Sequence, residues 1–146
     1  MNDTLTVSRW RSMTLMAAVL AVSCVSTGYH SMSHTGGFSE TPLSETSYQV
    51  RFQGNSFTSS EAADAMLLRR AAELTLERGY RYFVLSDQHS TARGDEPSVV
   101  ATIRFASTAD SPTIDAATVL SNVSRASELS PKARAALVEI QRRQQR

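Results

Sequence analysis

The sequence is poor in the residue types that define several classes of small protein. Its 146 residues include a single cysteine, Cys24, which excludes an internal disulfide framework and zinc sites built from four cysteines or from two cysteines and two histidines. Its 15 Lys and Arg residues nearly balance 14 Asp and Glu residues, leaving a net charge of +1. The chain therefore lacks the basic excess that drives binding to nucleic acid, and we expect no nucleic-acid partner.

The sequence also lacks an apolar run of the roughly 20 residues that a membrane-spanning helix needs. Its nearest approach is 13–22, a stretch of ten uncharged residues that follows the cationic segment Arg9-Trp10-Arg11. A positive flank, a short apolar stretch and small residues at its end are typical of a secretory signal. The end of this segment, Leu20-Ala21-Val22-Ser23-Cys24, resembles the lipobox of bacterial lipoproteins, in which the cysteine thiol receives diacylglycerol.

The lipobox predicts that 1–23 is a signal peptide and that acyl chains on Cys24 anchor the mature chain in a membrane. Two acyl chains suffice for stable anchoring where one does not. Val25, rather than aspartate, follows the cysteine, which in enterobacterial lipoproteins indicates the outer membrane. The alternatives are an ordinary signal peptide cut near this position and a buried helix. We expect a lipid-anchored protein of the bacterial envelope that faces the periplasm.

Beyond the anchor, the composition predicts a linker and then one domain. Residues 24–46 are expected to form the lipid anchor and a flexible linker, because Ser, Thr and Gly predominate there without an apolar period. A coil of about 22 residues would reach roughly 25 Å on average, enough to hold a domain clear of the headgroups. Residues 47–146 are expected to form an α+β domain with a C-terminal helix.

The most regular pattern predicts a long helix after a first strand at 48–53. The sequence Thr58-Ser59-Ser60-Glu61 has the form of a capping box, and Gly79 is placed to end the helix after Arg78. Alanine and leucine residues share one side of this helix. The charged residues fall on the opposite side and are expected to face solvent, with one pair spaced for a weak ion pair; these residues are Arg69, Arg70, Glu73 and Glu77.

Two further strands are expected at 80–85 and 99–105, joined by a polar loop over 86–97. The strand–helix–strand order predicts a right-handed crossover with the first two strands parallel. The third strand would return antiparallel. The predicted fold is therefore α+β, a small mixed sheet of about three strands (β-α-β-β) packed on one main helix. A C-terminal helix is expected over 131–146, whereas 107–129 predict no definite element.

The middle of the chain is similar to a known family. The pattern Tyr48-x-Val50-x-Phe52-x-Gly54-Asn55, the run LLRRAAELTL at 67–76, and Gly79-Tyr80-x-Tyr82-Phe83 together resemble a family of small, uncharacterised bacterial lipoproteins. The resemblance covers 48–85, with weaker similarity through the third strand. It agrees with the lipobox and implies no reaction, substrate or catalytic residue.

Tyrosines form the first candidate binding site. Tyr48, Tyr80 and Tyr82 would place phenol groups on neighbouring parallel strands, where they could form a face for a partner or ligand. The alternative is that they are half-buried structural tyrosines of a sheet, which are more common. A helix start at Thr58-Ser59-Ser60 could bind phosphate, but Glu61 already supplies a negative charge there, which favours simple capping.

Histidines are the other candidates. His30 and His34 are separated by three residues, the spacing of helical zinc sites, but they lie in the expected linker. His89 lies in the polar loop with three acidic residues that could gather a metal, although a solvated loop is the simpler interpretation; these residues are Asp87, Asp95 and Glu96. We predict no metal site, no cofactor and no catalytic residue.

Three classes of function fit these observations. The favoured one is a non-enzymatic, membrane-anchored lipoprotein whose periplasmic domain contacts another envelope protein or has a structural role. The alternative is a lipid-tethered module that binds a small ligand or a metal. A cell-wall enzyme would need a convergent nucleophile or acid/base set, and no pairing in the sequence supplies one.

Overall fold

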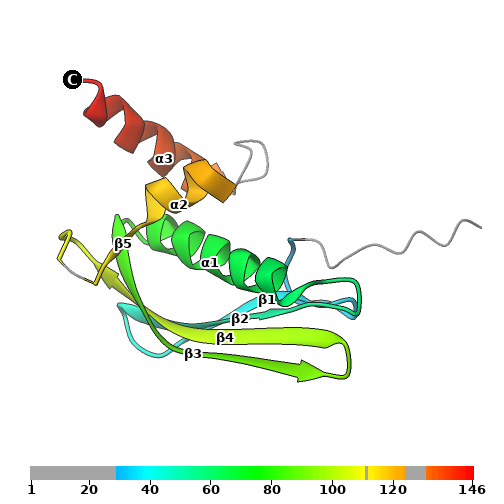
Figure 1. Cartoon of the computed structure of the whole chain (residues 1–146). Coiled ribbons are helices and arrows are strands. Elements are labelled where there is room, and N and C mark those ends of the chain that lie inside the picture. The colour runs from blue at the N-terminus through cyan, green and yellow to red at the C-terminus, as the bar shows by residue number, and fades with distance from the viewer. Residues whose placement is uncertain (1–28, 111, 124–130) are drawn as a thin grey trace, which may run out of the picture.

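A computed structural model describes residues 29–110, 112–123 and 131–146. Along the chain, the elements are β1 (Gly37–Pro42), β2 (Ser47–Gln53), α1 (Ser60–Glu77), β3 (Tyr82–Arg93), β4 (Glu96–Ala106), β5 (Ile114–Asp115), α2 (Ala116–Val123) and α3 (Pro131–Gln144). The strands form one sheet, and the helices lie on one side of it (Figure 1). The predicted α+β class is confirmed.

Within the described residues the sheet has five strands, in the order β1-β2-β4-β3-β5, and all neighbours are antiparallel. β2 and β3 run in the same direction, but β4 lies between them and pairs with both. The prediction of about three strands with two parallel neighbours is therefore wrong. The reason is that β3 and β4 form a hairpin, and its returning strand takes the central place beside β2.

β1 arises within 24–46, which the sequence predicts to be a lipid anchor and flexible linker. It pairs antiparallel with β2 in a continuous register along all six of its residues. Phe38 packs against the hydrophobic core from this strand. The linker prediction is therefore wrong for residues 37–42, because the backbone hydrogen bonds of this segment are made with β2 and one of its side chains reaches the core.

The predicted polar loop over 86–97 is also wrong, because these residues extend the two strands of a hairpin. β3 continues to Arg93, which pairs with Glu96 at the start of β4. Gly94 has a φ of +62° in the two-residue turn, a conformation that glycine adopts without steric cost. The segment is polar because the outer half of β3 is exposed to solvent.

The start of α1 is capped one position later than predicted. The side chain of Ser59 accepts a hydrogen bond from the backbone N–H of Ala62 at 3.1 Å. Thr58 instead donates its hydroxyl to the side-chain oxygen of Asn55, at 3.1 Å. A hydrogen bond from its own backbone amide, followed by one from Ser59, lowers the pKa of Glu61 in the first turn.

The predicted end of α1 is confirmed. Gly79 has a φ of +83°, and its N–H donates to the carbonyl of Leu76 at 3.0 Å. The N–H of Tyr80 donates to the carbonyl of Thr75 at 3.0 Å. These two bonds define a Schellman motif, which satisfies carbonyls that the end of a helix would leave without partners.

The core lies between α1 and the sheet. Most of its fully buried side chains come from α1 and from β2, β3 and β4, and the largest are Phe52, Phe83, Leu67, Leu74 and Ile103. Leu120 of α2 and Ala133 of α3 are also fully buried. α2 and α3 pack against α1. The predicted C-terminal helix is confirmed as α3, while α2 lies in the part of the chain for which the sequence predicts no element.

Candidate functional site

The charged side of α1 is buried, contrary to the prediction that it faces solvent. Arg69, Arg70 and Glu73 expose only 5%, 8% and 1% of their surface. The predicted ion pair between Arg69 and Glu73 is present, with Nε 3.3 Å from Oε1. The residues form one stripe, because their spacings of three and four positions bring side chains together along a helix. This stripe is buried because side chains from 29–40 lie against it.

The Glu73 carboxylate lies at the centre of these charges. Its Oε1 accepts a hydrogen bond from Nε of Arg69 at 3.3 Å. Its Oε2 accepts one from Nη1 of Arg70 at 3.2 Å and another from the hydroxyl of Tyr29. A buried charge is costly unless it is paired and hydrogen-bonded, and here both carboxylate oxygens have donors.

Arg70 links α1 to β1. Its Nη2 and Nε lie 2.8 and 3.3 Å from the two carboxylate oxygens of Glu40, which is the bidentate geometry of a strong ion pair. Its Cζ lies 4.7 Å from the ring centroid of Phe38. Burial by itself lowers the pKa of Arg70, but the hydrogen bond with Glu40 and the charges of Glu77 and Glu40 outweigh it and raise the pKa above its usual value.

Tyr29 covers the other guanidinium group. The Cζ atom of Arg69 lies 3.7 Å from the centroid of the Tyr29 ring, a distance typical of a cation–π contact. The same ring lies 5.0 Å from the ring of Phe38. Burial, followed by the hydrogen bond to Glu73, raises the pKa of the phenol above its ordinary value, so Tyr29 stays a hydrogen-bond donor.

We call this group the N-terminal clamp, and its members are Tyr29, Phe38, Glu40, Arg69, Arg70 and Glu73. The clamp joins the segment that begins at Tyr29 to the middle of α1. Its geometry favours a structural role, because both oxygens of Glu73 are already hydrogen-bonded within the protein.

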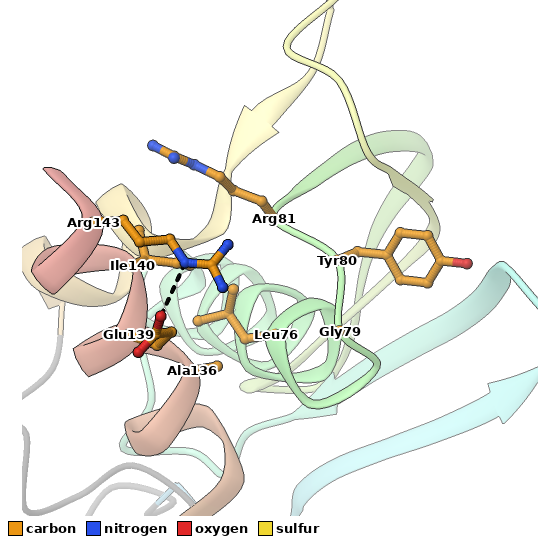
Figure 2. A pocket seen from close by; sticks show the side chains of 8 residues that line it. All are labelled: Leu76, Gly79, Tyr80, Arg81, Ala136, Glu139, Ile140 and Arg143. Atoms are coloured by element: carbon orange, nitrogen blue, oxygen red, sulfur yellow. Dashed lines mark hydrogen bonds and ion pairs between the residues drawn. The ribbon is translucent and has the colours of Figure 1, made fainter.

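A second feature is a surface groove between the C-terminal end of α1 and α3 (Figure 2). Its volume is about 260 Å³, and its apolar lining is formed by Leu76 from α1 with Ala136 and Ile140 from α3. Small-molecule pockets usually have volumes of about 300–1,000 Å³. The groove is therefore large enough for a small apolar group.

Charged side chains rim this groove and are paired within the protein. Nε of Arg143 lies 3.0 Å from Oε1 of Glu139, as the dashed line in Figure 2 shows. Nε and Nη2 of Arg81 lie 3.0 and 2.9 Å from Oδ2 of Asp115. Oδ1 of Asp115 accepts the backbone N–H of Ala117 at 2.8 Å and so caps α2. The rim therefore also connects the start of β3 to α2.

The three candidate tyrosines do not form one face, so that prediction is wrong. Tyr48 is 5% exposed, and its ring centroid lies 5.5 Å from that of Phe105. Tyr80 stacks on the same phenylalanine at 5.2 Å, and its ring points away from the groove in Figure 2. Tyr82 precedes the buried Phe83 in β3 and therefore lies on the opposite face of the sheet.

The candidate histidines lie in two different parts of the fold. His30 and His34 lie in the turn before β1 rather than on a helix, and Nδ1 of His30 is 2.7 Å from the carbonyl oxygen of Ser31. His89 is exposed on β3. Across 29–110, 112–123 and 131–146, no three His, Cys, Asp or Glu side chains lie close enough to hold a metal ion.

The sequence does not predict three members of the clamp, Tyr29, Phe38 and Glu40. Residues 37–42 have the sequence GFSETP, in which apolar and polar residues do not alternate as they do in a half-buried strand. Two aromatic residues in a stretch of Ser, Thr and Gly are the signal that this stretch is folded.

Cys24 and the signal-like segment before it lie outside the described residues, so the lipidation site stays a prediction. Among the helices that the structure does describe, none has the length and apolarity to cross a bilayer. No protein-family model, curated protein or solved structure matches this chain.

The clamp predicts a large difference between two chemically identical substitutions. Glu73→Gln should lower the free energy of unfolding by about 3 kcal/mol, because it removes a buried charge that two guanidinium groups share. Glu139→Gln breaks an exposed ion pair and should cost less than about 1 kcal/mol. Urea denaturation measures both values. Equal losses in the two variants would contradict the importance of the clamp.

Proposed function

We propose that this chain is a bacterial lipoprotein, held in the outer membrane by acyl chains on Cys24, with its α+β domain in the periplasm. The observation that carries the proposal is the order of residues at the N-terminus: a cationic segment, an apolar stretch, and small residues that end in the only cysteine. The resemblance of 48–85 to a family of small lipoproteins supports it independently.

We further propose that the domain is non-enzymatic and binds another envelope protein through the open face of its sheet. The described helices cover the other face (Figure 1), so this one is turned toward solvent. Exposed Arg51 and Arg104 lie opposite half-buried Val100 and Val84, respectively. This mixture of apolar area and arginine is typical of protein interfaces.

The groove between α1 and α3 favours a second candidate function, a lipid-tethered module that binds a small ligand. Its apolar lining would contact an apolar group, and a polar end of the ligand could lie near Arg81 or Arg143 at the rim. The two functions predict different surfaces of contact, because the groove lies on the helical side of the sheet.

The lipoprotein proposal predicts that Cys24→Ser moves the protein from the membrane fraction to the soluble fraction. The substituted hydroxyl is not acylated, so mass spectrometry of the purified protein should show no acyl groups. Ser23→Ala is the matched control, since it keeps the cysteine and a small residue before it. Cys24→Ser protein that still fractionates with membranes would contradict the proposal.

The partner proposal predicts site-specific crosslinking in cells. A photoreactive residue in place of Arg51 should give a discrete adduct with another envelope protein, identified by mass spectrometry, because this side chain lies on the open face of the sheet. The same residue in place of Gln145, which is exposed beyond α3, should give none. An adduct from position 145 alone would refute the assignment of the open face.

A further inference from the structure

We infer that the folded domain lies directly against the bilayer surface, with the turn His30–Thr35 at the lipid headgroups. This inference rests on the proposed lipidation of Cys24. It goes beyond the proposed function because it names the surface that faces the membrane and the lipid headgroups as its partner.

The length of chain between the anchor and the fold carries the argument. Only residues 25–28 separate Cys24 from Tyr29. Five residue steps span at most about 18 Å when fully extended. The predicted linker of about 22 residues would have placed the domain roughly 25 Å away on average. With Tyr29 held in the fold, the distance from Cys24 to the domain therefore has a much lower upper limit than the predicted linker would allow.

The span from Cys24 to Tyr29 is small compared with the dimensions of the domain and the bilayer. A domain of about 100 residues has a radius of gyration of about 13 Å, and its diameter is correspondingly larger. The headgroup layer on each side of a bilayer is roughly 5–8 Å thick. An anchor whose acyl chains enter the hydrocarbon region therefore keeps the surface around Tyr29 at or near the headgroups.

The clamp keeps the tether short. Tyr29 is held by its hydrogen bond to Glu73 and by the guanidinium of Arg69 over its ring. Releasing it would remove one of the three hydrogen-bond donors of a carboxylate that is 1% exposed, and would also remove the ring from the guanidinium of Arg69. Hydrogen bonds to charged groups contribute more to stability than neutral ones. Detaching Tyr29 to lengthen the chain would therefore lose both of these contacts.

The surface next to the clamp has a chemistry that suits lipid headgroups. The turn His30–Thr35 is exposed and contains no acidic residue, and the side chain of Met32 is 39% exposed. Its backbone is fixed by hydrogen bonds from Met32 N to Phe38 O at 2.7 Å and from Phe38 N to His30 O at 2.8 Å. It therefore presents an apolar side chain and polar groups without carboxylates that would repel anionic lipids.

Fluorescence quenching tests this inference on the intact acylated protein in vesicles of phosphatidylethanolamine and phosphatidylglycerol. A fluorophore is attached at His34→Cys, whose thiol is the only free one when Cys24 is acylated. Lipids with a spin label on the headgroup should quench it strongly. Inserting 20 Gly and Ser residues between Thr27 and Gly28 adds about 25 Å of reach and should reduce quenching at least about twofold.

The outcomes separate this inference from the proposed function. Mass spectrometry of the same preparation first shows whether Cys24 carries acyl chains. A protein without them overturns the lipoprotein proposal and this inference together. An acylated protein whose quenching is weak, or is unchanged by the insertion, overturns only the inference that the domain lies on the bilayer surface.

Discussion

The burial of the Glu73 carboxylate between two arginine side chains is the constraint on which the N-terminal half of the structure depends. A charge that is 1% exposed needs donors on every side, and α1 supplies only two of them, Arg69 and Arg70. The third donor is the hydroxyl of Tyr29, which lies 44 positions earlier in the sequence. The position of Tyr29 against α1 and the proposed distance to the membrane follow from this requirement.

The sequence predicted the elements that depend on local patterns. The helix α1 and its glycine stop were visible because apolar spacing and Gly79 act over short distances. The pairing of strands could not be predicted in this way, because β4 lies between β2 and β3 through contacts that are distant in sequence. The hairpin over 86–97 was also not predicted. The outer half of β3 is exposed on both faces, so its sequence lacks the alternation of apolar and polar residues that indicates a half-buried strand.

The candidate site was predicted less well, for a physical reason. Arg69, Arg70, Glu73 and Glu77 have the pattern of a solvated helix face, and only the covering segment decides whether such a face is buried. Glu40, which pairs with Arg70, belongs to β1, and the sequence of α1 alone gives no sign of this contact. The prediction of a tyrosine face was wrong because tertiary contacts pack Tyr48 and Tyr80 on Phe105, while Tyr82 lies on the opposite face of the sheet.

Hydrogen exchange of the β1 amides shows whether the segment after Tyr29 is part of the fold. We expect the amides of 37–42 that pair with β2 to exchange as slowly as those of β2 itself. The amide of Met32, whose N–H donates to Phe38 O at 2.7 Å, should also be protected. Exchange of these amides at the rate of an unstructured linker, with β2 still protected, would show that 29–42 do not belong to the fold.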